Sequence, residues 1–414
     1  MKTTKILCAG ALALTGVSLA SAQTVIKVTG STAFRKAAYF AIVDSLNSPK
    51  GAAIGGSSGN MEGAGRAVIT GTLKSGSSAG QAVVFEVAWA GSVGGVQVLT
   101  QNLSTLPGAA FTAAQTWLNS SNSLGSLVAN SSTGHITGYT EITGTPAFDA
   151  ASTADATMSD SFQSSTSFQN PVLNDYQDPA AIVSGVGVVE FVWTKGVQHP
   201  SIPTASYNAL TNASPLALQN LLANGIVPLS VFTGNNADEA YDVVLVGRNN
   251  DSGTRLDAEA ETGYGFSQSE TQYQPVGNPV SSLTSVGNNG YASGGNVATA
   301  LNTPISASAT DANGKPFVLL GYVGINDNNS VNSGNNKLAY TGVAYSQPAI
   351  REGQYTFWSY EHLLTRTTLS GVKLNAVQLY GTTLVNTDAN LSGVTLSTMN
   401  VLRTIEGGVP ATLF

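Results

Sequence analysis

Short β-rich runs alternate with short helical patterns along the chain, and this alternation restricts the possible folds more than any other feature. Residues 25–28 form a strand-like run, and Phe34, Ala38, Ile42 and Leu46 then recur at helical spacing. This order predicts an α/β fold.

Four later runs predict further strands because polar or glycine-rich turn residues follow each of them: 83–88, 186–193, 243–246 and 317–323. Residues 215–223 predict a helix, with Ser214 as its N-cap and Asn224-Gly225 as its stop. Two stretches, 51–80 and 104–169, are poor in charge and rich in Ser, Thr, Asn and Gly. We expect both to be surface elaborations rather than core.

The amino terminus has the pattern of a secretory signal peptide. Lys2 and Lys5 come first, the apolar run 6–20 follows, and a small-x-small motif predicts cleavage between Ala22 and Gln23. The run is shorter than the roughly 20 residues that span a bilayer. We therefore expect a periplasmic or secreted protein.

Charge and cysteine content narrow the class further. The formal net charge of −7 makes nucleic acid an unexpected partner. A hydrophobic content of 42% over 414 residues predicts a globular chain of two or three domains. Cys8 is the only cysteine and lies within the predicted signal, so we expect no disulfide in the mature protein.

Two turns near the amino terminus combine hydroxyl side chains, backbone N–H groups and the start of a helix. They are 29–34 and 89–96, and each follows a predicted strand. Such a combination favours an oxyanion because the amides and the helix dipole point at it. Taken alone, the first turn also fits an ordinary helix cap and the second an ordinary loop.

A third turn adds a cation. Arg248 follows the strand at 243–247, and Ser252-Gly253-Thr254 opens the segment 255–262. The guanidinium offers a planar fork of donors suited to phosphate, and Gly253 permits close approach of the backbone. The alternative is a surface arginine beside a capped helix.

Catalytic and metal patterns are weak. The stretches 55–59 and 76–80 fit G-x-S-x-G, but we expect neither to follow a strand and open a helix as a nucleophile elbow does. His135, His199 and His362 have no metal-ligand spacing, so each is interpreted as a surface or core histidine.

The order of six segments resembles the high-affinity phosphate-binding proteins of bacterial phosphate ABC importers. That family has a GSST- or GATF-like loop, a G-S-x-x-G loop, an A-S-D turn, an R-x-x-G-S-G-T segment, an I-G-Y-V strand and a K-L-A-Y run. The matching segments here are 30–34, 91–95, 158–160, 248–254, 320–323 and 337–340. Each is weak in a Ser/Gly-rich chain, but six in the family order are specific.

Carried over by position, the resemblance implies ten residues in contact with phosphate. They are Ser31, Thr32, Ala33, Phe34, Ser92, Asp160, Arg248, Ser252, Gly253 and Thr254. There are departures: Ala33 stands where the family has Ser or Thr, Asn250 where an acidic residue braces the arginine, and Asp251 where Gly is usual. The long segment before Asp160 leaves Asp155 as its competitor.

The resemblance also implies a fold and a role. It implies a two-lobed periplasmic-binding-protein fold with a ligand cleft between lobes that two crossover strands join. Lobe I is expected at 23–191 plus 346–414 and lobe II at 192–345. The implied protein is a monomer without cofactor, metal or catalytic residues, and its partners are inorganic phosphate and the membrane permease of an ABC importer. Two alternatives stay open: a secreted phosphate-scavenging or phosphate-ester hydrolase relative, and a surface or matrix protein that keeps the fold.

Overall fold

The computed structural model describes residues 23–56, 59–101, 111–112, 124–142, 148–149, 153–266, 268–331 and 336–412. The predicted signal peptide and Cys8 lie outside these ranges. Within them, no helix combines the length and the apolarity needed to cross a membrane.

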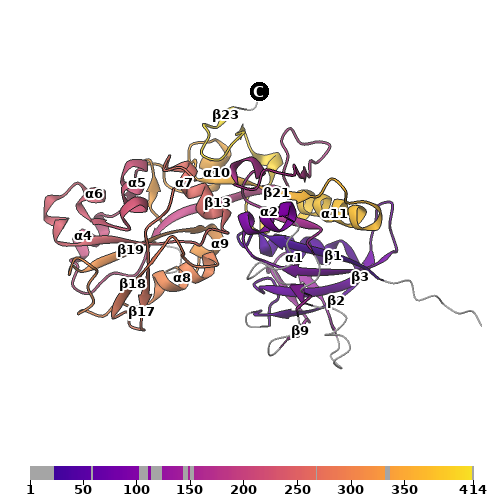
Figure 1. The fold of residues 1–414 in the computed structure, drawn as a ribbon, viewed down its shortest axis with the longest axis horizontal. Helices are drawn as coiled ribbons and strands as arrows, with labels where there is room; N and C mark the ends of the chain where they lie inside the picture. The colour runs from indigo at the N-terminus through magenta and orange to yellow at the C-terminus, as the bar shows by residue number, and fades with distance from the viewer. Residues whose placement is uncertain are drawn as a thin grey trace, which may run out of the picture.

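The described residues form two α/β lobes that share one mixed sheet (Figure 1). Along its main path the strand order is β15-β16-β19-β13-β21-β11-β1-β4-β3-β2-β6. Lobe I here denotes the part of the sheet from β11 to β6 with its helices, and lobe II the part from β15 to β19. The predicted α/β, two-lobed fold class is confirmed.

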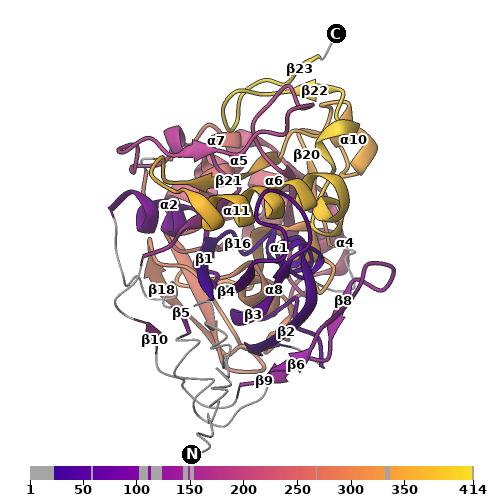
Figure 2. The ribbon, with the colours of Figure 1, turned by 90° about the vertical axis from the view of Figure 1, so that its right-hand side faces the viewer.

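Lobe I, which faces the viewer in Figure 2, is built around β1, and this strand pairs in parallel with both β4 and β11. Its main strands are β1 (Thr24–Gly30), β2 (Leu46–Ile54), β3 (Arg66–Leu73), β4 (Ala82–Ala88) and β11 (Ala156–Ser159). Its helices are α1 (Arg35–Asp44), α2 (Ser92–Gln101) and α11 (Gly371–Thr383). Short strands are β5 (Phe111–Thr112), β6 (Gly125–Ser126), β7 (Val128–Asn130), β8 (His135–Thr137), β9 (Thr140–Glu141), β10 (Phe148–Asp149), β12 (Asn174–Asp175), β22 (Val401–Leu402) and β23 (Ala411–Thr412).

Lobe II has α5 and α7 on one face of its sheet and α8 on the other (Figure 1). Its strands are β14 (Asn212–Ala213), β15 (Ile226–Pro228), β16 (Asp242–Val246), β17 (Gln272–Val276), β18 (Ser282–Gly287), β19 (Phe317–Gly324) and β20 (Ala339–Tyr340). Its helices are α4 (Thr204–Ala209), α5 (Pro215–Asn224), α6 (Ser230–Thr233), α7 (Gly253–Glu261), α8 (Gly294–Asn302) and α9 (Ile325–Asn328).

Two strands join the lobes, β13 (Gly187–Lys195) and β21 (Trp358–Thr365), and the short helix α10 (Gln347–Arg351) precedes the second. The first half of β13 pairs with β21 and its second half with β19, so the strand itself crosses from one lobe to the other. Aromatic rings fill this join: Trp193 lies 5.2 Å from Tyr322 and 6.0 Å from Phe357 between ring centroids. The exact lobe boundaries stay a prediction.

The strands predicted at 25–28, 83–88, 186–193, 243–246 and 317–323 are confirmed. The predicted helix at 215–223 is confirmed as α5. Ser214 Oγ accepts a hydrogen bond from the amide of Ala217, and Gly225 takes the left-handed conformation (φ 72°) that ends the helix.

The first helix is shorter than the helical spacing from Phe34 to Leu46 predicted. The helix α1 ends at Asp44, where the hydroxyl of Ser45 bonds back to the carbonyl of Ala41, and Leu46 begins β2. Leu46 is nevertheless buried, so its apolar character fits either structure.

The prediction that 51–80 is a surface elaboration is wrong. The strands β2 and β3 extend the sheet of lobe I, and Ala52, Ala53, Val68 and Ile69 are completely buried. The buried residues of these strands include larger apolar side chains as well as alanines, so a stretch that is rich in Ser, Thr and Gly overall still contributes to the core.

The prediction for 104–169 is wrong for part of the stretch. The strand β11 lies in the middle of the sheet between β1 and β21, and all four of its residues are buried. Much of the remaining stretch falls outside the described residues. A strand of four residues carries too little periodicity to be recognised in a polar context.

Candidate functional site

The turn between β1 and α1 is held tightly against β11. Gly30 has a φ of 114°, and a Cβ there would lie 1.9 Å from the carbonyl oxygen of Met158, so only glycine fits. The amide of Ser31 donates to the same carbonyl oxygen at 2.9 Å. The hydroxyl of Ser31 accepts from the amide of Phe34 at 3.3 Å, just before α1 begins.

The turn between β4 and α2 is another strand end that leads directly into a helix. Ser92 is the first residue of α2 and is 1% exposed. Its hydroxyl accepts a hydrogen bond from the amide of Asp160 at 3.1 Å. The second predicted anion turn is therefore a helix start, not a plain loop.

The third turn belongs to lobe II. Ser252 caps α7, and its hydroxyl accepts from the amide of Arg255 at 3.2 Å. The hydroxyl of Thr254 donates to Oδ2 of Asp160 in lobe I at 3.2 Å. A Cβ on Gly253 would lie 1.6 Å from Oδ1 of Asp160, so the absence of a side chain there allows the lobes to approach.

The guanidinium of Arg248 is 2% exposed and also reaches across to lobe I. Its Nε donates to the carbonyl of Tyr291 at 3.2 Å, and one terminal nitrogen donates to the carbonyl of Ala292 at 3.1 Å. The same nitrogen lies 3.4 Å from the hydroxyl of Thr32. Burial lowers the pKa of Arg248, whereas the charges of Asp327 and Asp160 raise it.

These contacts show what orients Arg248, which the sequence left open. Asn250 does not brace it: its side chain accepts from Asn288 at 3.1 Å. The backbone carbonyls of Tyr291 and Ala292 take that place. Carbonyl groups carry no side-chain signature, so no sequence signal could have identified Tyr291 or Ala292.

Arg255, the neighbouring arginine, has a different environment. Its Nε pairs with Glu259 at 2.8 Å, and another nitrogen donates to the carbonyl of Asn288 at 2.9 Å. A further contact at 3.4 Å reaches the carbonyl of Arg248. Arg255 thus supports the turn that carries Arg248.

Asp160 and Asp155 occupy separate positions. Asp155 accepts from the backbone amide of Lys27 and forms an ion pair with Lys373, each at 2.9 Å. Asp160 is 2% exposed, and its Oδ1 has no hydrogen-bond partner within the described residues. Burial raises the pKa of Asp160, while Ser92, Arg248 and Thr254 partly offset the rise.

Two more buried carboxyls lie near Asp160, and the sequence analysis missed both. Burial raises the pKa of Asp257 well above its usual range, and the charges of Asp160, Glu406 and Glu361 add to the rise while Arg403 lowers it. Burial and the charge of Asp160 likewise raise the pKa of Glu361, which the hydroxyl of Ser31 lowers. The position of Asp257, three residues after Thr254 on a helix, was the available signal.

The ten predicted residues are only partly brought together. Ser92, Asp160, Gly253 and Thr254 form one contiguous group, and Arg248 links it to Thr32. Phe34 packs its ring against Gly187 of β13, so only its backbone faces the turn.

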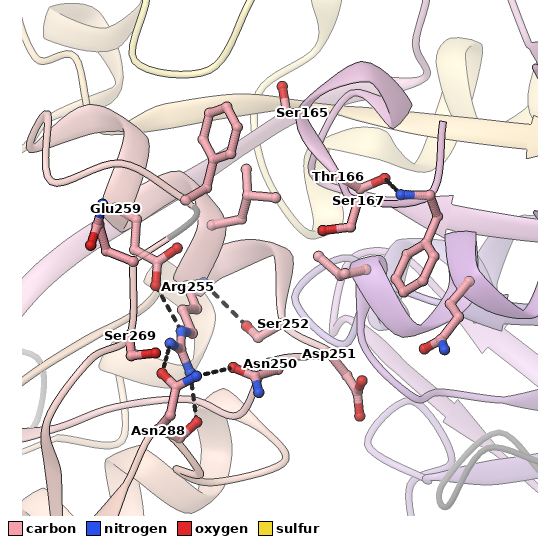
Figure 3. Close-up of a pocket in the computed structure, with 16 residues that line it drawn as sticks. Ser165, Thr166, Ser167, Asn250, Asp251, Ser252, Arg255, Glu259, Ser269 and Asn288 are labelled. Carbon is pink, nitrogen blue, oxygen red and sulfur yellow. Dashed lines mark hydrogen bonds and ion pairs between the residues drawn. The ribbon is translucent and has the colours of Figure 1, made fainter. Parts of the chain in front are cut away.

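Ala33 and Thr32 line a cavity of about 170 Å³ together with Arg35, Lys36 and Asp327. Ser252 instead lines a separate, larger cavity of about 440 Å³ (Figure 3). Asp160, Arg248 and Thr254 line neither cavity and are almost completely buried. The side chains of these three residues are therefore shielded from solvent.

The two G-x-S-x-G stretches do follow strands, which corrects the expectation for both. One comes after β2 and the other lies between β3 and β4, yet both lead to a further strand rather than a helix. Ser57 and Ser58 lie outside the described residues.

The histidines are surface or core residues as predicted. His135 contacts Glu62, His199 contacts the carbonyl of Ala309, and His362 is buried against Asp175. In the described part of the chain, no group of three or more His, Cys, Asp or Glu is placed to hold a metal.

No protein-family model matches the chain, and no curated protein matches it significantly. Solved structures give distant likenesses. A Clostridium perfringens protein named as a phosphate ABC transporter substrate-binding protein, solved with bound phosphate, is 10% identical, with a TM-score of 0.44 over 90% of this chain and 99% of that one.

A phosphate-binding protein from Planctomyces limnophilus is 12% identical, with a TM-score of 0.40 over 89% of this chain and 90% of that one. An ABC-type phosphate transport receptor from Vibrio cholerae is 14% identical, with a TM-score of 0.35 over 58% and 77%. At this distance, the function has to be judged from the residues of this chain.

Proposed function

We propose that this chain is an extracytoplasmic solute-binding protein that captures inorganic phosphate for an ABC importer. The observation that carries the proposal is that hydroxyls and helix starts from two lobes meet at Asp160, with the charge of Arg248 near enough to lower the pKa of that carboxyl. Thr254 of lobe II donates to Asp160, and Arg248 of lobe II reaches Thr32 of lobe I. We propose the ten residues of the sequence analysis as the set that surrounds the ligand, with Ala33 and Phe34 contributing backbone groups.

Two features suit this group to an anion. The amino-terminal ends of α2 and α7 both lie at Asp160, and helix amino termini carry partial positive charge. Arg248 supplies a full charge in a buried setting, where hydrogen bonds to an oxyanion are strengthened.

The nearby carboxyls do not oppose this role as strongly as their number suggests. Burial raises the pKa of Asp160, Asp257 and Glu361, so each holds a proton more readily than an exposed carboxyl. A protonated Asp160 donates a hydrogen bond to the anion, and an ionised Asp160 accepts one from a P–OH group.

The mechanism follows from contacts that span both lobes. A ligand held by lobe I and lobe II binds the closed arrangement better than the open one, and so shifts the equilibrium towards closure. The permease then distinguishes the loaded protein by its shape. In this proposal residues 1–22 are removed on export, lobe I comprises 23–191 plus 346–414, lobe II comprises 192–345, and the protein acts as a monomer.

The test is a thermal-shift series on residues 23–414 with phosphate, arsenate, sulfate and molybdate, followed by calorimetric titration. Binding to the folded state alone raises the melting temperature with affinity and concentration, so phosphate should raise it more than sulfate does. Failure of saturating phosphate to shift the transition or to give a binding isotherm would rule out the proposed function.

A further inference from the structure

The cavity of about 440 Å³ lies between the lobes and directly beside the proposed anion site (Figure 3). Val93, which follows Ser92 on α2, lines it from lobe I. Ser252, the cap of α7 and a member of the proposed phosphate set, lines it from lobe II. Ser252 thus connects the cavity with the proposed phosphate set, and a group attached to a phosphate oxygen would extend past Ser252 into the cavity.

Hydrogen-bonding side chains dominate the walls. Figure 3 shows Ser165, Thr166 and Ser167 on one side, and Asn288 and Ser269 on the other. The volume falls within the roughly 300–1,000 Å³ typical of small-molecule sites. Hydroxyl and carboxamide groups both donate and accept, which matches a ligand part that bears several hydroxyls.

The charges in the cavity argue against a second anionic group. Arg255 is engaged by Glu259 at 2.8 Å and by the carbonyl of Asn288 at 2.9 Å, so its charge is already compensated. Asp251 lines the cavity as well and adds a carboxyl. A second phosphate or a carboxylate would lack a free cation, whereas a neutral group meets no such penalty.

Two phenylalanines also line the cavity, Phe168 from lobe I and Phe266 from lobe II. Phe266 is 45% exposed, so part of its ring is open to contact with a ligand. Aromatic rings beside hydroxyl donors suit a polyol, because its C–H face packs on a ring while its hydroxyls bond to the neighbouring polar groups.

We propose that the cavity accepts the polyol part of a phosphate monoester, so that the protein binds sugar or glycerol phosphates as well as inorganic phosphate. This inference rests on the proposed function, because the phosphoryl group would occupy the same anion site. The neutral polyol would then lie between the walls formed by 165–168 and by α7.

The experiment is calorimetric titration of residues 23–414 with inorganic phosphate, methyl phosphate, glycerol 3-phosphate and glucose 6-phosphate. Free glycerol and free glucose test whether the polyol binds without the phosphoryl group. We expect the two polyol phosphates to bind roughly tenfold or more tightly than methyl phosphate. Methyl phosphate lacks the hydroxyls that would bond to the cavity walls, and the loss of such contacts lowers affinity by about that factor. Polyol phosphates that bind no better than methyl phosphate overturn the inference.

The variant Ser167→Trp tests the role of the cavity, because Ser167 lines the cavity, is exposed and lies outside the proposed phosphate set. Its affinity for inorganic phosphate serves as the matched control. Filling the cavity should lower the affinity for glucose 6-phosphate by roughly tenfold or more and leave that for inorganic phosphate within about twofold. Equal affinities of parent and variant for glucose 6-phosphate overturn the inference. Phosphate binding without polyol selectivity rejects this inference alone, whereas the absence of all phosphate binding rejects the proposed function too.

Discussion

The hydroxyl of Thr254 donates to the carboxyl of Asp160 at 3.2 Å, and this single hydrogen bond connects the start of α7 in lobe II with the end of β11 in lobe I. Ser92 and Gly253 lie against the same aspartate. In the proposed function, closure of the lobes and recognition of the ligand would therefore both involve Asp160.

Replacement of Arg248 by Ala should weaken phosphate binding strongly. A charge-assisted hydrogen bond contributes roughly 1.5–3 kcal/mol, which corresponds to about 10- to 150-fold in affinity. Arg351→Ala, at the end of α10, provides the control. Arg255→Ala would not serve, because Arg255 supports the turn that carries Arg248 and its loss would not be neutral. Calorimetry that shows equal affinities for both variants would remove Arg248 from the site.

Replacement of Gly253 by Ala should hold the lobes apart. The new Cβ would meet Oδ1 of Asp160 at 1.6 Å, and the three atoms nearest to it all belong to lobe I. Gly295→Ala in the first turn of α8 is the control, since its Cβ would meet only ordinary contacts, 3.5 Å from Asp327. In X-ray scattering, phosphate should reduce the radius of gyration of the parent and of Gly295→Ala, but not that of Gly253→Ala.

Asp160→Asn should narrow the preference for phosphate over sulfate. An ionised Asp160 accepts a hydrogen bond from the P–OH group of phosphate, but sulfate has no proton to give and leaves a buried acceptor unpaired, at a cost of roughly 1–3 kcal/mol. The amide of Asn can donate, so sulfate binding should improve. Asp155→Asn, which alters the pair with Lys373, should keep the parent selectivity in competition titrations.

The same preference should depend on pH in the parent. Burial raises the pKa of Asp160, so this carboxyl gains its proton at a higher pH than an exposed aspartate does. A protonated Asp160 donates to sulfate, and selectivity for phosphate should therefore fall as the pH is lowered. A selectivity that is constant with pH, or one that rises on acidification, would show that Asp160 is not the filter.

Asp257 should make the protein less stable as the pH rises. Its folded-state pKa is raised well above 3.8, so the folded state keeps a proton that the unfolded state has already lost. The contribution of Asp257 to the free energy of unfolding is fully present at low pH. It declines as the pH rises above the ordinary aspartate pKa, by up to about 1.4 kcal/mol per pH unit for one proton. Asp257→Asn should flatten the dependence of melting temperature on pH, and Glu239→Gln on the surface should leave the parental slope unchanged.

Several elements could be predicted because their signals are local. The α5 helix is specified by Ser214, Pro215 and Gly225, which act within a few residues of one another. The buried strands β16 and β19 are apolar along almost their whole length, as expected for strands covered on both faces, and Glu86 alone interrupts the apolar run of β4. The turns at Ser31, Ser92 and Ser252 were recognisable for the same reason, since hydroxyl, glycine and helix start follow directly in the chain.

Local patterns of residues were enough to predict the alternation of strands and helices and the three turns that lead from a strand into a helix. The packing of the lobes, in contrast, established that Asp160 rather than Asp155 meets Thr254, a partner 94 residues away, and that Arg248 reaches Thr32 across 216 residues. It also placed Asp257 and Glu361 beside Asp160 and opened a cavity next to Ser252. Such pairings depend on how the lobes pack, and packing is set by contacts summed over the whole fold, which no local pattern of residues encodes.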